Sequence, residues 1–318
     1  MSIRSPRKLL LASLLLLAAC GADSGPDEST PDDDRLVVVA TTSILGDIAS
    51  NVAGEEARVE VLIPIGVDSH DFQPSSQQAS LLAEADLVVA NGLGLEQGLE
   101  ELLAARADED GPIIELAPLI DPISFSGHEE EGHEEEDHEH GSEDPHFWMD
   151  PIRVGAAAVA LATELTELHP DGSWDDRAAE YSAGMEATDE TIRGILEPVP
   201  EDDRSMVTNH EAFGYFADRY GFEIVGVVIP GGSTLAEPSS AELAELVAEM
   251  TQHGTRVIFA ETTQPTTLAD AVAAELGSEV EVVELFTESL GPEGSQAETL
   301  ASMLESNASA IAAALGRE

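Results

Sequence analysis

The sequence predicts an α/β fold of two Rossmann-like lobes, each with a parallel sheet, joined by a long backbone helix. Valine-rich apolar runs alternate with stretches of helical periodicity in the first half of the chain, which is typical of a parallel sheet covered on both faces. The second half repeats this alternation. A strand-free stretch rich in Ala, Glu and Leu separates the two halves.

The first residues have the layout of a secretory signal. Arg4, Arg7 and Lys8 precede an apolar run over 9–19, which is too short to span a membrane as a helix. We therefore predict a signal peptide over 1–19. The run ends in Leu17-Ala18-Ala19-Cys20-Gly21, which resembles a bacterial lipobox, so Cys20 is expected to become the lipidated amino terminus. It is the single cysteine of the chain, which excludes an internal disulfide.

After Cys20, residues 20–34 are rich in Ser, Pro, Gly, Asp and Glu and have no apolar period, which predicts a disordered tether. The first lobe is then expected over 35–172. Its predicted strands are 35–41, 59–63, 86–90 and 112–116, and its predicted helices are 44–52, 76–84, 96–107 and 151–168. A histidine-rich acidic loop over 127–144 interrupts this lobe, and its low complexity indicates an insertion with no packed core.

The linking segment is predicted over 173–198, with one long helix from Trp174 to Leu196. The second lobe follows over 199–318. Its predicted strands are 205–209, 222–229, 256–260 and 280–285, and its predicted helices are 211–220, 240–253, 268–276 and 297–315. Because a continuous helix resists the backbone rotation that a loop hinge absorbs, we expect only a small closure movement between the lobes.

The charge balance excludes several classes of function. Lys and Arg total 13 against 64 Asp and Glu, a formal charge of −51, which is the opposite of what phosphate recognition requires and argues against a nucleic-acid partner. Lys8 is the single lysine and leaves with the signal peptide. The mature chain therefore has no lysine for Schiff-base or nucleotide-binding chemistry.

Three histidines occupy similar positions in the two halves. His70 lies beyond a predicted strand, His146 precedes the central helices, and His210 directly follows a strand of the second half. Ligands of open α/β sheets bind beyond the carboxyl ends of the strands, so these side chains can meet in one cleft between the lobes. Three imidazoles with a carboxylate form a plausible site for a borderline cation such as Zn²⁺.

Five segments carry a family resemblance in order along the chain: GVDSHDFQPS, ADLVVANGLGLEQGL, DPHFWMDP, NHEAFGYFADRYG and LFTESLGPEGS. They resemble the solute-binding proteins of zinc and manganese ABC importers, in which the first segment reads GxDPHxYxP, with Ser69 here in place of the proline. The resemblance implies metal ligation by His70, His146 and His210, with Glu288 as the fourth ligand. Glu261, which also follows a strand, is interpreted as a supporting acid, and water is the remaining alternative for the fourth position.

The resemblance implies an extracytoplasmic lipoprotein, anchored to the membrane through Cys20, that captures a transition-metal ion and delivers it to an ABC permease without catalysing a reaction. A monomer is expected. The three-histidine set and the imidazoles of the 127–144 loop favour Zn²⁺, and Mn²⁺ is the alternative within the family. A zinc-dependent hydrolase using the same histidines is the rival of another class. HEEEG at His128 and HEAFG at His210 lack the second histidine of an HExxH helix, which argues against the zincin type of hydrolase.

Overall fold

The computed structural model describes residues 35–125, 143–277 and 279–316. The predicted signal peptide, Cys20 and the tether lie outside the described residues, as does most of the 127–144 loop. In the described part of the chain, none of the helices combines the length and apolar character needed to cross a membrane.

The first sheet is four-stranded and parallel, with strand order β2-β1-β3-β4, and comprises β1 (Leu36–Ala40), β2 (Ala57–Val61), β3 (Leu87–Ala90) and β4 (Ile113–Glu115). β1 and β3 are central and almost wholly buried, as their unbroken apolar runs require. The helix after β1, α1 (Ser43–Ala53), begins where the Thr42 hydroxyl accepts the backbone N–H of Leu45.

The second sheet repeats this topology with order β6-β5-β7-β8 and parallel pairing throughout. Its strands are β5 (Ser205–Thr208), β6 (Glu223–Val227), β7 (Val257–Glu261) and β8 (Glu281–Leu285). In both sheets the first strand of the lobe lies between its second and third, so the strand order reverses at the first strand. The loops that leave the strands near this reversal are the usual place for a ligand in such sheets.

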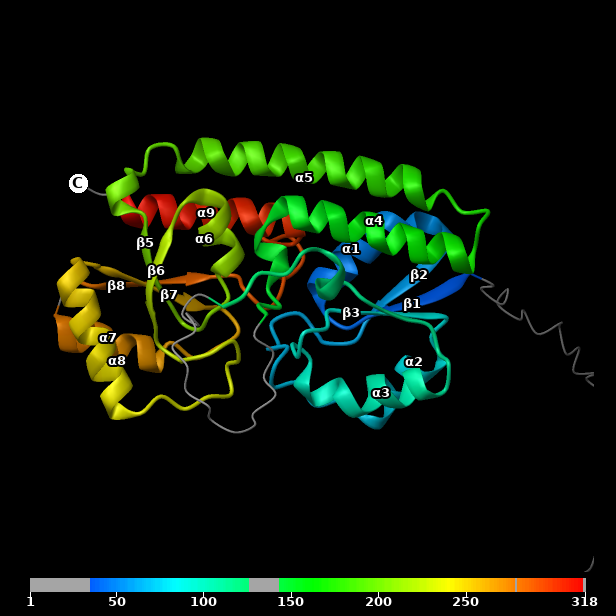
Figure 1. Ribbon diagram of the computed structural model, residues 1–318, viewed down its shortest axis with the longest axis horizontal. Coiled ribbons are helices and arrows are strands. Elements are labelled where there is room, and N and C mark those ends of the chain that lie inside the picture. Colours follow the sequence, from blue (N-terminus) through cyan, green and yellow to red (C-terminus); the bar gives the residue numbers. More distant parts are fainter. Residues whose placement is uncertain (1–34, 126–142, 278, 317–318) are drawn as a thin grey trace, which may run out of the picture. The chain divides into compact units, whose positions relative to one another are not determined.

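The helices cover both faces of each sheet, as Figure 1 shows: α2 and α3 lie on one face of the first sheet and α1 and α4 on the other, while α7 and α8 lie on one face of the second sheet and α9 on the other. Their bounds are α2 (Ser76–Glu84), α3 (Glu100–Asp108), α4 (Pro151–Leu168), α6 (Gly214–Tyr220), α7 (Ser240–His253), α8 (Thr267–Leu276) and α9 (Leu300–Leu315).

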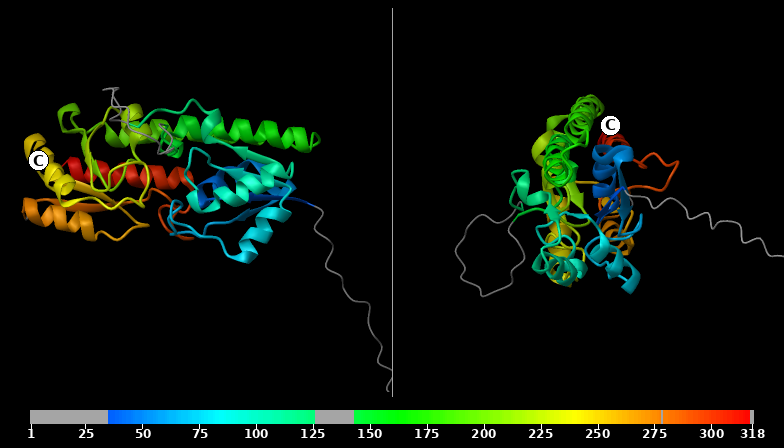
Figure 2. Two further views of the ribbon diagram at one scale, coloured as in Figure 1. Left: turned by 60° about the horizontal axis from the view of Figure 1, so that its bottom comes forward. Right: turned by 90° about the vertical axis from the view of Figure 1, so that its right-hand side faces the viewer.

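The long helix α5 (Trp174–Leu196) links the two sheets. It runs past both of them and packs against α1 and α4 of the first lobe and α9 of the second (Figures 1 and 2). Its buried apolar residues belong to one hydrophobic cluster that continues through both lobes, from Trp148 and Met185 to Phe213 and Leu304. Separate clusters fill the opposite faces of the two sheets.

The predicted fold class, two α/β lobes with parallel sheets and a long backbone helix, is confirmed. Three predicted helices were extended too far at their amino-terminal ends: 96–107, 211–220 and 297–315 begin at Glu100, Gly214 and Leu300. In the first case the Glu96 carboxylate accepts the Thr41 hydroxyl and the backbone N–H groups of Asn91 and Gly92, which fixes a turn where the apolar spacing alone predicted a helix.

Candidate metal centre

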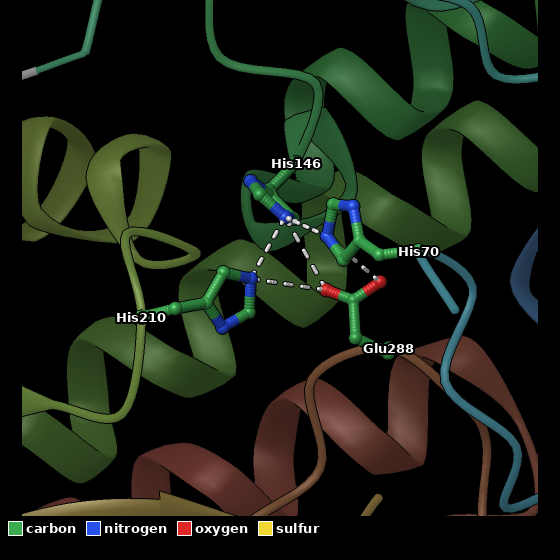
Figure 3. A group of neighbouring side chains, drawn as sticks. All are labelled: His70, His146, His210 and Glu288. Carbon is green, nitrogen blue, oxygen red and sulfur yellow. Dashed lines mark hydrogen bonds and ion pairs between the residues drawn. The ribbon is translucent and has the colours of Figure 1, made fainter. Parts of the chain in front are cut away.

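Four side chains from both lobes converge on one point. His70, His146, His210 and Glu288 each offer a ligand atom, and these atoms all lie within 4.8 Å of one another (Figure 3). None of the four residues is more than 2% exposed. The sequence prediction named these four residues, and the fold brings all of them together.

Each side chain comes from a segment next to a strand end or a helix start. His70 lies in the long loop between β2 and α2, and His146 lies just before the short turn that leads into α4. His210 follows β5 after a single intervening residue, and Glu288 lies just beyond β8. The four groups therefore belong to the carboxyl-terminal edges of both sheets and to the start of α4, as expected for ligand sites in open α/β sheets.

An aspartate two residues earlier shapes the backbone at two of the histidines. Asp68 Oδ1 accepts the backbone N–H of His70 at 2.7 Å, and Asp144 Oδ1 accepts that of His146 at 2.9 Å. Such side-chain-to-backbone bonds stabilise turns outside regular structure. The other oxygen of Asp68 accepts a hydrogen bond from Gln264 of the second lobe, so this turn also joins the two halves.

Four of the six spacings between the donor atoms are close to those of a small four-coordinate ion. His146 Nε2 lies 3.4 Å from His70 Nε2, 3.2 Å from His210 Nε2 and 3.3 Å from Glu288 Oε1, while Glu288 Oε1 and His210 Nε2 are 3.7 Å apart. Zn–N distances of 2.0–2.1 Å in a tetrahedron require donor atoms about 3.3 Å apart. These four spacings are close to that value, and all the donor atoms lie within 4.8 Å of one another.

Carboxylates orient two of the three imidazoles. Asp144 Oδ1 lies 2.7 Å from Nδ1 of His146, and Glu261 Oε1 contacts Nδ1 of His210. A carboxylate on Nδ1 leaves Nε2 free to bind and makes it a stronger donor, an arrangement that accompanies most metal-binding histidines. Glu261 thus lies behind His210, outside the group of four. In the described part of the chain, nothing forms a hydrogen bond with Nδ1 of His70.

Electrostatics favour a cation at the centre. Glu288, Asp144 and Glu261 are buried, and in the described residues their ion-pair partners are the histidines. When the imidazoles are neutral, as metal binding requires, this leaves three negative charges that burial makes costly. A divalent cation would compensate for most of this charge.

The pKa values of the site groups reflect this environment. Burial, assisted by the neighbouring imidazoles, lowers the pKa of His70 to about 3. Burial also disfavours protonation of His146, but Asp144 and Glu288 outweigh it and raise its pKa to about 10. In the same way Glu261 raises the pKa of His210, and the three histidines hold the pKa of Glu288 below its ordinary value although burial opposes this. A metal ion competes with protons for the coordinating nitrogens, so a raised histidine pKa opposes metal binding at low pH.

The sequence prediction missed Asp144 and the role of Ser69. The signal for Asp144 was present, because DSH at His70 and DPH at His146 share an aspartate two residues before the histidine. Ser69, whose hydroxyl donates to Glu288 Oε2, was noted only as a replacement for proline. Its partner lies 219 residues away, and no local pattern connects the two.

Comparison with known proteins identifies the family. The family model for the zinc-uptake complex component A, periplasmic, matches residues 38–314. The chain belongs to this family. It is 30% identical over 313 residues to the manganese-binding lipoprotein MntA of Halalkalibacterium halodurans, covering 97% of each protein. It is 29% identical over 278 residues to the high-affinity zinc uptake system protein ZnuA of Bacillus subtilis, covering 86% of each.

The family's fold is also shared in three dimensions. The periplasmic zinc-binding protein TroA of Treponema pallidum superimposes with a TM-score of 0.77 at 28% sequence identity, covering 89% of this chain and all of TroA. Family membership therefore covers both lobes and the linking helix. Because the relatives include proteins named for zinc and for manganese, membership alone leaves the choice of metal open.

Proposed function

We propose that the chain is the solute-binding component of an ABC importer for a transition-metal ion, that the ion is Zn²⁺, and that His70, His146, His210 and Glu288 bind it. The observation that carries the proposal is the burial of this set between the two lobes. A site assembled from both lobes can bind the ion when they are together and weaken when they separate, which suits capture followed by delivery.

The donor set favours zinc over manganese. Three imidazoles and one carboxylate are suited to zinc, whereas manganese prefers carboxylate, carbonyl and water oxygens in an octahedral shell. The distances of 3.2–3.7 Å between neighbouring donors also suit a four-coordinate ion. Manganese remains the alternative within the family, supported by the similarity to MntA.

The remaining parts of the proposal concern location and partners. We place the mature protein outside the cytoplasm, anchored by lipid on Cys20, where it would deliver its ion to a membrane permease. The lipobox ending in Cys20 and the relatives described as lipoproteins support this placement. We propose no catalytic step. The relatives are named for metal binding and uptake, which gives the zinc-dependent hydrolase alternative no support.

The test is a competition titration of the purified, metal-free protein with zinc and with manganese, for the wild type and for His70→Ala, His146→Ala, His210→Ala and Glu288→Gln. Each histidine substitution should lower zinc affinity by at least about tenfold, because even the partners of ligands contribute that much. His253→Ala is the matched control, because His253 is an exposed histidine on α7, and this variant should bind as the wild type does.

Two results would contradict the proposal. The first is wild-type zinc affinity in His146→Ala or His210→Ala, which would show that the ion binds elsewhere. The second is irreversible unfolding when the metal is removed, because a structural ion contributes directly to folding, whereas a carrier must release its ion and remain folded.

A further inference from the structure

Ser69 connects the loop of one ligand to the side chain of another. It is adjacent to His70 in the first lobe, it is 1% exposed, and its hydroxyl donates a hydrogen bond to Oε2 of Glu288 in the second lobe. Proline, which the pattern quoted above has at this position, could not make this bond. The contact is therefore a feature of this chain's own residues at the site.

The two oxygens of Glu288 have different environments. Oε1 lies 3.3 Å from His146 Nε2 and 3.7 Å from His210 Nε2, and no hydrogen-bond partner for it exists among the described residues. Oε2 is bound to Ser69 and is 3.8 Å from the nearest imidazole nitrogen, His70 Nε2. Figure 3 shows Oε1 directed toward the point where the imidazoles meet. Oε1 thus faces the imidazole nitrogens without a hydrogen-bond partner among the described residues, whereas the bond from Ser69 fixes the position of Oε2.

The backbone around Glu288 is also fixed to the first lobe. Trp148 Nε1 donates to the carbonyl of Thr287 at 2.9 Å, and the Ser289 hydroxyl accepts the backbone N–H of Gly66 at 2.8 Å. The main chain on both sides of Glu288 is therefore held in place. Bringing Oε2 to the centre would require rotation of the side chain, which would break the bond to Ser69.

We propose that Ser69 restricts Glu288 to coordination through one oxygen and thereby determines the preference of the site for zinc over manganese. This inference depends on the proposed function. With one carboxylate oxygen and three imidazoles the ion has four ligands, which is the shell that zinc prefers. Manganese prefers a larger, oxygen-rich shell, and Oε2 is an additional carboxylate oxygen 3.8 Å from His70 Nε2. Ser69 keeps it out of that shell.

The experiment compares Ser69→Ala, which removes the hydroxyl, with Ser69→Thr, which retains it. Zinc and manganese affinities are measured by competition at one pH, and the visible absorption of bound Co²⁺ reports the number of ligands, because four-coordinate Co²⁺ absorbs far more strongly than six-coordinate Co²⁺. Ser69→Ala should lower the ratio of zinc to manganese affinity by about tenfold or more and weaken the cobalt bands. Ser69→Thr should retain both properties.

Ser289→Ala is the matched control. It removes another buried serine hydroxyl that bonds across the lobes, but one that does not touch the Glu288 carboxylate. It should change the affinities for both metals by the same factor and leave their ratio and the cobalt bands unaltered. Should Ser69→Ala fail to fold, Ser69→Gly also lacks the hydroxyl and carries the same expectation.

If Ser69→Ala leaves both the ratio of zinc to manganese affinity and the cobalt bands unchanged, the inference is wrong. Zinc binding by the wild type would still support the proposed function in that case. An equal fall of the ratio in Ser289→Ala would also overturn it, since lobe contact in general would then set the preference. A different result would contradict the proposed function, namely wild-type zinc affinity in His146→Ala.

Discussion

The carboxylates behind two of the imidazoles give the sharpest test of the site. Asp144→Asn and Glu261→Gln remove a charge and keep the size of the side chain. Asp144 Oδ1 lies 2.7 Å from His146 Nδ1, and Glu261 Oε1 contacts His210 Nδ1. Both residues are 1% exposed, so solvent screens these interactions weakly.

The expected loss of zinc affinity depends on which interactions of the carboxylate the amide side chain keeps. An amide oxygen can still accept the Nδ1 hydrogen, so the tautomer that presents Nε2 to the metal is preserved, while the negative charge that strengthens the imidazole as a donor is lost. Loss of such a partner costs about 10–100-fold in metal affinity, or about 1.4–2.7 kcal/mol. We expect about tenfold for Asp144→Asn, because the amide oxygen can also retain the 2.9 Å bond to the His146 backbone N–H. Glu261→Gln should cost more, since Glu261 also accepts the Thr287 hydroxyl next to Glu288.

The assay is a calorimetric or competitive zinc titration of the metal-free variants at constant pH. Glu96→Gln is the matched control, because Glu96 is also a buried carboxylate with several hydrogen bonds but touches none of the four candidate ligands. Its zinc affinity should remain within about twofold of the wild type. Equal affinities for Asp144→Asn, Glu261→Gln and the wild type would refute the orienting role of the carboxylates, and so would an equal loss in Glu96→Gln.

Three further predictions concern other parts of the chain. Cys20→Ala should abolish lipid attachment, and metabolic labelling with a fatty acid that equals the wild type would contradict the lipobox assignment. Deleting 128–140 should remove weak additional zinc equivalents in a titration and leave one tight site; loss of the tight site would show that this loop supplies a ligand. Asp189→Asn should lower the free energy of unfolding by about 1–2 kcal/mol at pH 7, because Asp189 accepts hydrogen bonds from Arg219, Arg193 and Tyr220. These bonds hold the pKa of Asp189 below its ordinary value of 3.8, so the stabilisation is complete above that pH and disappears as the pH falls through the lower, folded-state pKa. Thermal unfolding of wild type and variant should therefore converge in strong acid, and a difference that persists there would contradict this origin.

The fold could be predicted from the sequence because its elements have strong periodic signals. The buried runs of β1 and β3 and the long amphipathic pattern of α5 lie where they were expected. The errors occurred at helix starts, where side-chain hydrogen bonds to the backbone can replace helical ones. At Glu96, for example, a side chain that fits a helical period instead accepts the backbone N–H groups of a preceding turn. Hydrophobic spacing carries no information about such a bond.

The candidate site was predictable only in part, for a related reason. The histidines could be singled out because each lies at a strand end or a helix start, where the topology places ligands. Glu288 needed the family resemblance, because several acids of the second lobe follow strands and Glu261 fits that rule equally well. The structure separates them by distance: Glu261 reaches the far nitrogen of His210, while Glu288 Oε1 lies 3.3 Å from the near nitrogen of His146.

The way in which the lobes are joined bears on how an ion could leave the site. The continuous helix α5 and the hydrophobic cluster shared by both lobes oppose a wide opening. A wide opening is also unnecessary, since Zn–N bonds are only about 2.0–2.1 Å long and a small separation of the ligands is enough to break them. Small separations of Glu288 and His210 from the first-lobe histidines would suffice, and they would also strain the Ser69 and Trp148 bonds to the segment that carries Glu288. We therefore expect metal release to be coupled to the loss of these hydrogen bonds, with the hydrophobic core remaining intact.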